Sequence, residues 1–336
     1  MKAAMRDRYG GPEVVEVREV EVPKATEDRI LVRVMAASIN RADLDGLGPR
    51  WLFTRLLFGL RAPRIKQIGL DVAGVVEAVG PGATRFKPGD RVFADLFLYG
   101  QGAFAEFACA REKAFLPIPD GMSFEHAATL PHAGVLAIQG LRLRDGRTIG
   151  PGDQVMVVGA SGNVGPFAVQ IAKAMDAEVT GVCRTEKIDF VRSLGADHVI
   201  DYTTTDYTRP PAPFNWIEDV DAHHSIARFR GALKPGGVYR AMGGSSAWLF
   251  QTLLLWPFVG WGGGRSLGLL LDWKPFKPED VETLTRLIAA GEVRPAIDRT
   301  FPLADIAEAL RYVDSGAPKG KVVILPATDP AQPVLS

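Results

Sequence analysis

The chain has 336 residues, with 39 Lys and Arg balanced by 39 Asp and Glu. A net charge of zero gives no reason to expect nucleic acid or an anionic membrane as a partner. The two cysteines, Cys109 and Cys183, form no CxxC or metal-ligand pattern and fit a reducing compartment. The length predicts about two domains. The N-terminus shows no secretory signal, so we expect a cytoplasmic protein without an integral membrane span.

Short apolar runs separated by Gly and Pro dominate the first 119 residues. The predicted strands cover 14–17, 30–35, 72–79, 91–93 and 104–108. Many short strands at this spacing are typical of a barrel-like β domain. Ser123 then predicts the start of a helix, because serine is a preferred N-cap residue and Glu125 follows in the first turn.

A strand, a glycine-rich turn and a helix follow between 154 and 175. The strand covers 155–158, and the helix carries an apolar stripe at i, i+3 and i+4 spacing, with Asn163 as its expected cap and Pro166 in its first turn. A second strand at 178–183 completes a βαβ unit. Such a turn places free N–H groups at a helix N-terminus, where a pyrophosphate binds. The residues expected to hold it are Gly159, Ala160, Ser161, Gly162, Asn163, Val164 and Gly165. The alternative is a turn that only closes a strand–helix corner.

The pattern continues with strands at 214–219, 237–242 and 267–271 and a helix at 223–233. These elements predict an α/β, doubly wound sheet that holds a whole dinucleotide. Helices at 279–290 and 303–314 and a terminal strand at 320–325 then return the chain to the first domain. We therefore predict one domain from 1–122 and 273–336, and a nucleotide-binding domain from 123–272.

Several segments along the chain together resemble one protein family. They lie at 32–43 (VRVMAASINRAD), 69–93 (GLDVAGVVEAVGPGATRFKPGDRVF), 102–107 (GAFAEF), 154–202, 297–310 (IDRTFPLADIAEAL) and 320–324 (GKVVI). The chain resembles a zinc-independent medium-chain dehydrogenase/reductase of the quinone-oxidoreductase (zeta-crystallin-like) branch. That resemblance implies a GroES-like β-barrel domain built from both ends of the chain, an inserted Rossmann domain, and an active site in the cleft between them.

Zinc alcohol dehydrogenases of this superfamily hold a catalytic metal with two cysteines and a histidine. Aligned on the motifs, those positions fall on Asn40, Leu70 and Ala133, and the relay hydroxyl falls on Ala42. No metal site is expected. His132 lies beside the third position and is expected to be a pocket or core histidine.

The resemblance implies hydride transfer from a reduced nicotinamide to a quinone or an α,β-unsaturated carbonyl, which hydrogen-bond donors can support. Asn40 is the predicted donor nearest the substrate, and Asp43 is expected to support the site. Relatives often carry a tyrosine where this chain has Asp45. Tyr99 could supply a phenol instead, and bulk water is the other alternative, so the proton donor stays open.

The cofactor form is predicted from the end of the second strand. NAD-preferring enzymes carry Asp or Glu there. This chain has Cys183 followed by Arg184 and Lys187, which suit a 2′-phosphate and favour NADP(H), although Glu186 lies between the two basic residues. Tyr202 resembles the family tyrosine near the cofactor. The remaining predicted contacts, at the ends of later strands, are Val220, Gly243 and Leu271.

One departure from the family pattern concerns the turn after the fourth strand. Relatives commonly have a glycine where this chain has Ala222, which is expected to bring a Cβ close to the nicotinamide ribose. The apolar stretch at 248–261 could line the pocket, form a dimer interface or contact a membrane.

The sequence therefore predicts an NADPH-dependent, zinc-independent oxidoreductase that acts on a small quinone or enone and forms a homodimer. The alternative is a non-catalytic NADP(H)-binding redox sensor. A zinc-type alcohol dehydrogenase is a distant third reading.

Overall fold

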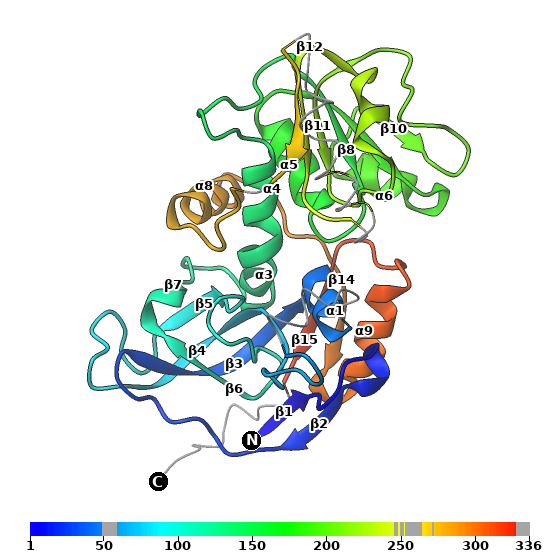
Figure 1. The fold of residues 1–336 in the computed structure, drawn as a ribbon. Helices are drawn as coiled ribbons and strands as arrows, with labels where there is room; N and C mark the ends of the chain where they lie inside the picture. The colour runs from blue at the N-terminus through cyan, green and yellow to red at the C-terminus, as the bar shows by residue number, and fades with distance from the viewer. Residues whose placement is uncertain (49–58, 245–247, 249–251, 253–263, 271, 327–336) are drawn as a thin grey trace. The chain divides into compact units, whose positions relative to one another are not determined.

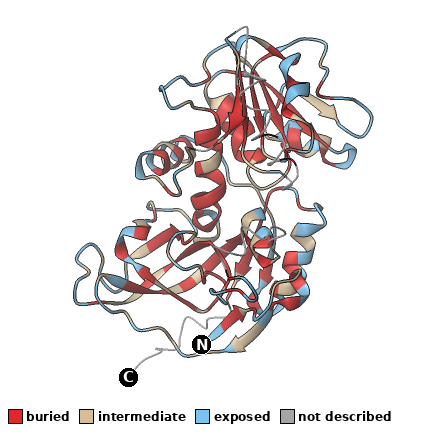
Figure 2. Ribbon diagram, in the orientation of Figure 1, coloured by how far each residue is buried: buried red, intermediate tan, exposed pale blue. Residues whose placement is uncertain are grey.

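The structure is a computed structural model that describes residues 1–48, 59–244, 248, 252, 264–270 and 272–326. The chain forms two compact units, Met1–His132 with Ile297–Ser336, and Ala133–Ala296. Each unit has its own buried sheet core (Figure 2). In the described part of the chain, no helix is long and apolar enough to cross a membrane.

The first unit is built around a largely antiparallel sheet that joins both ends of the chain (Figure 1). Its strand order is β14 (Ile297–Pro302), β15 (Lys321–Leu325), β3 (Arg29–Ile39), β4 (Asp71–Val79), β5 (Arg91–Asp95) and β7 (Phe115–Pro117), with β6 (Phe107–Arg111) also on β3. A separate pair is formed by β1 (Lys2–Met5) and β2 (Glu16–Glu19). Apolar residues from both chain ends, such as Val32, Phe115 and Ile324, share one core. This is the predicted GroES-like β domain.

Short helices flank this sheet. They are α1 (Arg41–Leu47), α3 (Phe124–Thr129), α9 (Ile306–Asp314) and the 3-10 turns at Pro12–Val14, Glu112–Ala114 and Leu303–Asp305. The predicted cap of α3 is confirmed, because Ser123 Oγ accepts the His126 N–H at 3.2 Å. The strand predicted at 14–17 is partly wrong, since a 3-10 turn ends at Val14 before β2 begins. The strand predicted at 104–108 begins later, at Phe107.

The second unit holds a parallel sheet with strands in the order β10 (His198–Asp201), β9 (Glu178–Cys183), β8 (Gln154–Val158), β11 (Phe214–Asp219), β12 (Leu233–Ala241) and β13 (Ser266–Leu269). Relative to chain order this is 3-2-1-4-5-6, the Rossmann arrangement. The predicted doubly wound sheet is therefore confirmed. Around it lie α4 (Val135–Gly140), α5 (Gly165–Ala174), α6 (Ile188–Ser193), α8 (Pro278–Ala289) and shorter turns at Leu130–Gly134, Thr185–Lys187 and Ile226–Arg230.

Both predicted domain boundaries lie earlier in the chain than the structural ones. The helix α3 packs on β3, β4 and β15, so the first unit continues to His132 instead of ending at 122. The helix α8 packs on α4, and its Asp280 accepts hydrogen bonds at 2.7 Å from both Gln139 and Arg142. These bonds hold α8 in the second unit, which therefore continues to Ala296 instead of ending at 272.

Two further predictions differ from the structure or lie outside it. The helix predicted at 223–233 is only a 3-10 turn, Ile226–Arg230. The sixth strand ends at Leu269, and Leu271 lies outside the described residues, as does most of the apolar stretch at 248–261.

Candidate functional site

The glycine turn after β8 is shaped by two close backbone approaches. Gly159 has a φ of +77°, and a Cβ there would lie 2.8 Å from Val220 Cγ2. A Cβ on Gly165 would lie 2.2 Å from the carbonyl oxygen of Gly159. Real Cβ atoms do not approach a backbone oxygen so closely, so Gly165 allows α5 to begin directly against the turn. Both glycines are thus required by the fold itself.

Gly162 differs from these two glycines. Among the described residues, a Cβ there would meet only the Gly159 carbonyl oxygen, at the ordinary contact distance of 3.5 Å. The described part of the chain therefore leaves open the space beside Gly162, just before the ten-residue helix α5. The positive end of a helix dipole and free N–H groups favour an anion at such a place. The turn could therefore hold the pyrophosphate of a dinucleotide.

The prediction that Asn163 is the N-cap residue of α5 is wrong. Val164 is the N-cap residue, its backbone is already helical, and Asn163 makes no capping bond. Pro166 does occupy the first turn. The other turn residues, Ala160 and Ser161, are buried, and the Ala160 N–H donates to Val182 O at 3.1 Å. The absence of a side-chain cap leaves the turn's geometry to its glycines.

The ends of β9 and β10 bring a cation and a phenol together. The exposed Arg184 donates through Nε to Tyr202 Oη at 2.6 Å, and this bond raises the pKa of Arg184 further above its usual value. Lys187 is only 5% exposed, so its side chain is much less accessible to a ligand than that of Arg184. Cys183 is buried, which raises the pKa of its thiol to about 11. Arg184 is therefore the accessible cation at the predicted 2′-phosphate position.

The strands after the turn end in tightly bonded loops. The Val220 N–H donates to Val158 O at 3.1 Å, and the Ala222 N–H donates to Gly243 O at 3.3 Å. Ala222 is fully buried in the apolar core of this unit. Its Cβ is thus accommodated among apolar side chains.

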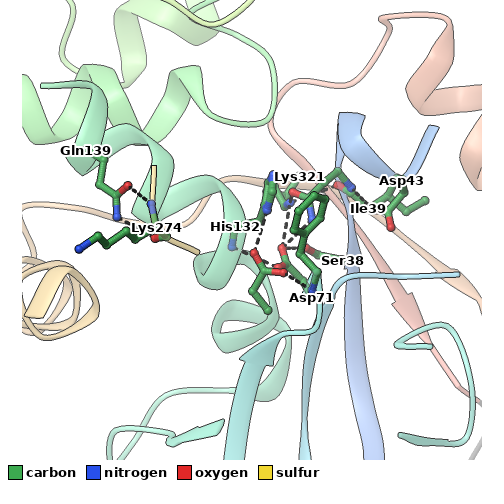
Figure 3. A network of polar contacts seen from close by, with 11 residues as sticks. Ser38, Ile39, Asp43, Asp71, His132, Gln139, Lys274 and Lys321 are labelled. Carbon is green, nitrogen blue, oxygen red and sulfur yellow. Dashed lines mark hydrogen bonds and ion pairs between the residues drawn. The ribbon is translucent and has the colours of Figure 1, made fainter. Parts of the chain in front are cut away.

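A second polar cluster lies in the first unit, where β3, β4 and β15 meet (Figure 3). Asn40 is 1% exposed, and both ends of its amide are bonded. Its Nδ2 donates to Asp71 Oδ2 at 2.8 Å, and its Oδ1 accepts from Lys321 Nζ at 2.6 Å. Lys321 also donates to Ile39 O at 3.1 Å, and Ser38 Oγ donates to Asp71 Oδ2 at 3.0 Å. The predicted donor Asn40 is thus held in one fixed orientation.

The same carboxylate extends the cluster to His132. Asp71 Oδ1 accepts the backbone N–H of His132 at 3.1 Å, and His132 Nδ1 lies 2.9 Å from Asp95 Oδ2. His132 is buried, as predicted for a pocket or core histidine. The roles of Asp71, Asp95, Lys321 and Ser38 were not predicted from the sequence. The available signal was a charged residue at the end of an apolar strand, as in the GLDVAG, RVFAD and GKVVI segments.

Burial changes the proton affinities in this cluster. It raises the pKa of Asp43 to about 7, because the hydrogen bond from the Asn40 N–H only partly offsets the loss of water. Burial also raises the pKa of Asp71, against the opposing charge of Lys321, and it lowers the pKa of Lys321. Asp43 Oδ1 has no hydrogen-bond partner among the described residues. The positive charge of Lys321 therefore does not fully offset the cost of burying the carboxylates of Asp43 and Asp71 in their ionised form.

The third predicted catalytic residue, Tyr99, lies in the turn at 97–100 and is half-buried. Its ring packs against the apolar core of the first unit. Leu70 and Ala133, at the positions that correspond to zinc ligands, are buried apolar residues. Within the described residues, no group of three or more His, Cys, Asp and Glu side chains is arranged to hold a metal ion.

Comparisons with known proteins agree with this architecture. Residues 26–120 match the model of the alcohol dehydrogenase GroES-like domain, and residues 194–324 match that of the zinc-binding dehydrogenase domain. A chloroplast envelope quinone oxidoreductase homolog of Arabidopsis thaliana is 31% identical, over 97% of this chain and 98% of its own. A chloroplastic NADPH-dependent alkenal/one oxidoreductase of the same plant is 30% identical, over 97% of this chain and 80% of its own.

Among solved structures, the quinone oxidoreductase of Escherichia coli complexed with NADPH superposes with a TM-score of 0.82. It is 25% identical and covers 97% of this chain and 100% of its own. The Rossmann sheet and the GroES-like unit both belong to this common architecture. The chain belongs to the quinone-oxidoreductase branch of the medium-chain dehydrogenase/reductase family, an oxidoreductase family with an NAD(P)-binding domain.

Proposed function

We propose that the protein is an NADPH-dependent reductase of quinones or α,β-unsaturated carbonyls. The observation that carries the proposal is the open backbone at Gly162, together with an exposed Arg184 directly after β9, where NAD enzymes carry an acidic residue. The substrate class comes from the relatives named above, which include a quinone oxidoreductase homolog and an alkenal/one oxidoreductase.

Different residues bind the two phosphate groups of the cofactor in this proposal. The turn at Gly162 and the N-terminus of α5 bind the pyrophosphate, while Arg184, steadied by Tyr202, binds the 2′-phosphate. When bound, a reduced nicotinamide supplies a hydride. Lys187 contributes less directly than Arg184 to binding of the 2′-phosphate, because the side chain of Lys187 is buried.

The substrate's developing oxyanion needs hydrogen-bond donors in fixed positions. Asn40 gives one amide hydrogen to Asp71, and we assign its second amide hydrogen to the substrate oxygen. Asp43 supports Asn40 by accepting its backbone N–H at 2.8 Å. Tyr99 remains an alternative phenol donor, although its ring packs on the core.

The proposal is tested by incubating the purified protein with NADPH and a panel of quinones, enals and enones, and following nicotinamide absorbance. Acceleration by members of this panel supports a reductase. Tight NADPH binding with no oxidation by any acceptor would instead favour the redox-sensor function, which is the second candidate because Asp45 stands at the family's tyrosine position and Ala222 replaces a glycine.

We also propose that the protein is a homodimer and that it acts in the cytoplasm. The dimer proposal rests on the apolar stretch at 248–261, and the compartment proposal rests on Cys109 and Cys183, which are free thiols as expected in a reducing compartment. Sedimentation of the purified chain and fractionation of the cells that make it test them separately.

A further inference from the structure

His132 lies in an unusual turn of the chain. Leu130–Gly134 form a π-helical turn between α3 and α4. Such turns are rare, and they occur frequently at functional sites. The backbone N–H of His132 donates to Asp71 Oδ1 at 3.1 Å, and this bond fixes the position of the backbone that carries the imidazole.

The imidazole ring is oriented by a second carboxylate. His132 Nδ1 lies 2.9 Å from Asp95 Oδ2, while Asp95 Oδ1 accepts the backbone N–H of Phe97 at 2.8 Å. The side chain of Asp95 is fully buried, whereas that of His132 is 10% exposed. A carboxylate on Nδ1 selects the tautomer in which Nδ1 carries hydrogen, so Nε2 becomes the nitrogen that takes up and releases a proton. His132 is thus more exposed than the carboxylates that hold it.

The surroundings of His132 favour its protonated form. Burial by itself lowers the pKa of His132, but the hydrogen bond and charge of Asp95 on β5 and the charge of Asp71 on β4 outweigh it, and the net pKa is raised. Lys321 on β15 acts in the opposite direction. Asp43 on α1 also interacts electrostatically with the ring.

We propose that His132 is the proton donor of the reduction, with Asp95 and Asp71 as its positioning residues. The inference rests on the proposed function and fills the role that the sequence left open. When a hydride adds to the β-carbon of an enone, the C=C π pair forms a double bond between the α-carbon and the carbonyl carbon, and the C=O π pair moves onto the oxygen. The His132 Nε2–H bond then breaks, its proton joins that oxygen to give an enol, and neutral His132 regains a proton from solvent. The enol becomes the saturated ketone by gaining a proton at the α-carbon and losing its hydroxyl proton to water. With a quinone, the hydride leaves one ring oxygen as an oxyanion, and His132 donates its proton to that oxygen to complete the hydroquinone.

Asn40 and His132 are joined through a single carboxylate, which supports this assignment. Asn40 Nδ2 binds Asp71 Oδ2, and the His132 backbone binds Asp71 Oδ1. Asp71 therefore positions both Asn40, which stabilises the oxyanion with a hydrogen bond, and His132, which neutralises the oxyanion with a proton. Tyr99 has no comparable tie to this cluster in any described contact.

The decisive variant is His132→Asn, which keeps an N–H for Asp95 but has no titrating nitrogen. We expect kcat for an enone to fall by about a hundredfold or more, since general acids contribute roughly 10²–10⁴-fold. NADPH affinity, measured by fluorescence titration, should be unchanged. The matched control is His126→Asn on the exposed side of α3, which should keep the wild-type kcat.

The pH profile separates catalysis from a structural role. A general acid works when protonated, so wild-type kcat should fall as the pH rises through the pKa of His132, above about 6.5. That fall should disappear in His132→Asn. It should move to lower pH in Asp95→Asn, because the charge that raises the pKa is gone. An unchanged fall in either variant would overturn the proposal.

A titration without substrate provides an independent readout. In ¹⁵N-histidine spectra of the wild-type protein, the pKa of His132 should lie above the ordinary value for histidine, and Asp95→Asn should lower that pKa. A His132 that titrates normally, or a His132→Asn variant with wild-type kcat, would contradict the assignment. If the wild type reduces none of the acceptors, the proposed function fails first, and a raised His132 pKa in these spectra would still be a separate result.

Discussion

Lys321 Nζ donates to Asn40 Oδ1 over 2.6 Å, although the two residues are 281 positions apart in the chain. Lys321 also lies 3.6 Å from Asp71 Oδ2, and both of these charged side chains are essentially inaccessible to water. The terminal strand is thus joined to the predicted catalytic residue by a buried charge. A buried cation is tolerated only when its partners satisfy it, so this bond links the stability of the first unit to the orientation of Asn40.

The first prediction concerns this link. Lys321→Met should destabilise the protein by about 3–5 kcal/mol, because it leaves the Asp71 carboxylate buried without its cation. Urea unfolding followed by circular dichroism measures the change. Lys319→Met, at an exposed position two residues earlier, is the control and should change stability little. A loss no larger than that of the control would show that Lys321 does not hold the cluster together.

The second prediction concerns pH. The folded state holds the proton of Asp43 up to about pH 7, whereas the unfolded chain releases it near pH 4. The folded state therefore binds more protons in this window, and the contribution of Asp43 to stability falls as the pH rises through it. Asp43→Asn keeps the acceptor for the Asn40 N–H but cannot ionise.

Unfolding free energies of Asp43→Asn and wild type, compared from about pH 4 to pH 8, test this point. The variant should gain up to about 4 kcal/mol on wild type across the window. Asp189→Asn, whose side chain is 98% exposed, should track wild type throughout. A constant difference between Asp43→Asn and wild type would mean that Asp43 is ionised throughout.

The third prediction separates the glycines of the turn. Gly165→Ala should cost about 1–3 kcal/mol or more, because its Cβ would collide with the Gly159 carbonyl oxygen. Gly162→Ala has no such collision, so the protein should keep its melting temperature and lose NADPH affinity. Thermal melting and NADPH titration measure the two effects. Undiminished NADPH binding by Gly162→Ala would argue against a pyrophosphate beside this residue.

The fourth prediction concerns the form of the cofactor. Arg184→Ala should weaken NADPH binding by roughly tenfold to a hundredfold, as expected for lost hydrogen bonds to a charged group, and leave NADH binding nearly unchanged. The control is Arg192→Ala, also exposed but on α6 and paired with Asp189. Equal losses for the two nucleotides in Arg184→Ala would remove the assignment of Arg184 to the 2′-phosphate.

The sequence was most informative where local patterns determine the structure. The strands at 178–183 and 214–219 match the structure residue for residue, because buried parallel strands are continuous apolar runs between turn signals. It failed where tertiary contacts decide. Asn163 is a good cap by type, yet the close approach of Gly165 to Gly159 sets the start of the helix. The stretch at 223–233 shortens to a 3-10 turn, for which the contacts of the described residues give no single cause.

The candidate site shows the same limit. Asn40 and the glycine turn could be found from motifs, since their neighbours in sequence identify them. The cluster that orients Asn40 joins residues near positions 40, 71, 95, 132 and 321, which come together through the pairing of β3 with β4 and β15, the pairing of β4 with β5, and the packing of α3 on the sheet. Sequence spacing holds no information on such contacts. The sequence therefore predicted a lone pocket histidine at 132, and the structure places two carboxylates on it.

The central claim is most directly tested by NADPH oxidation. Purified protein is mixed with NADPH and, in separate reactions, with a quinone, an enal, an enone and a simple aldehyde, and the loss of nicotinamide absorbance is compared with that in protein-free mixtures. The account predicts rapid oxidation with at least one quinone, enal or enone, much slower oxidation with the aldehyde, and a preference for NADPH over NADH. Tight NADPH binding without accelerated oxidation by any acceptor would contradict it.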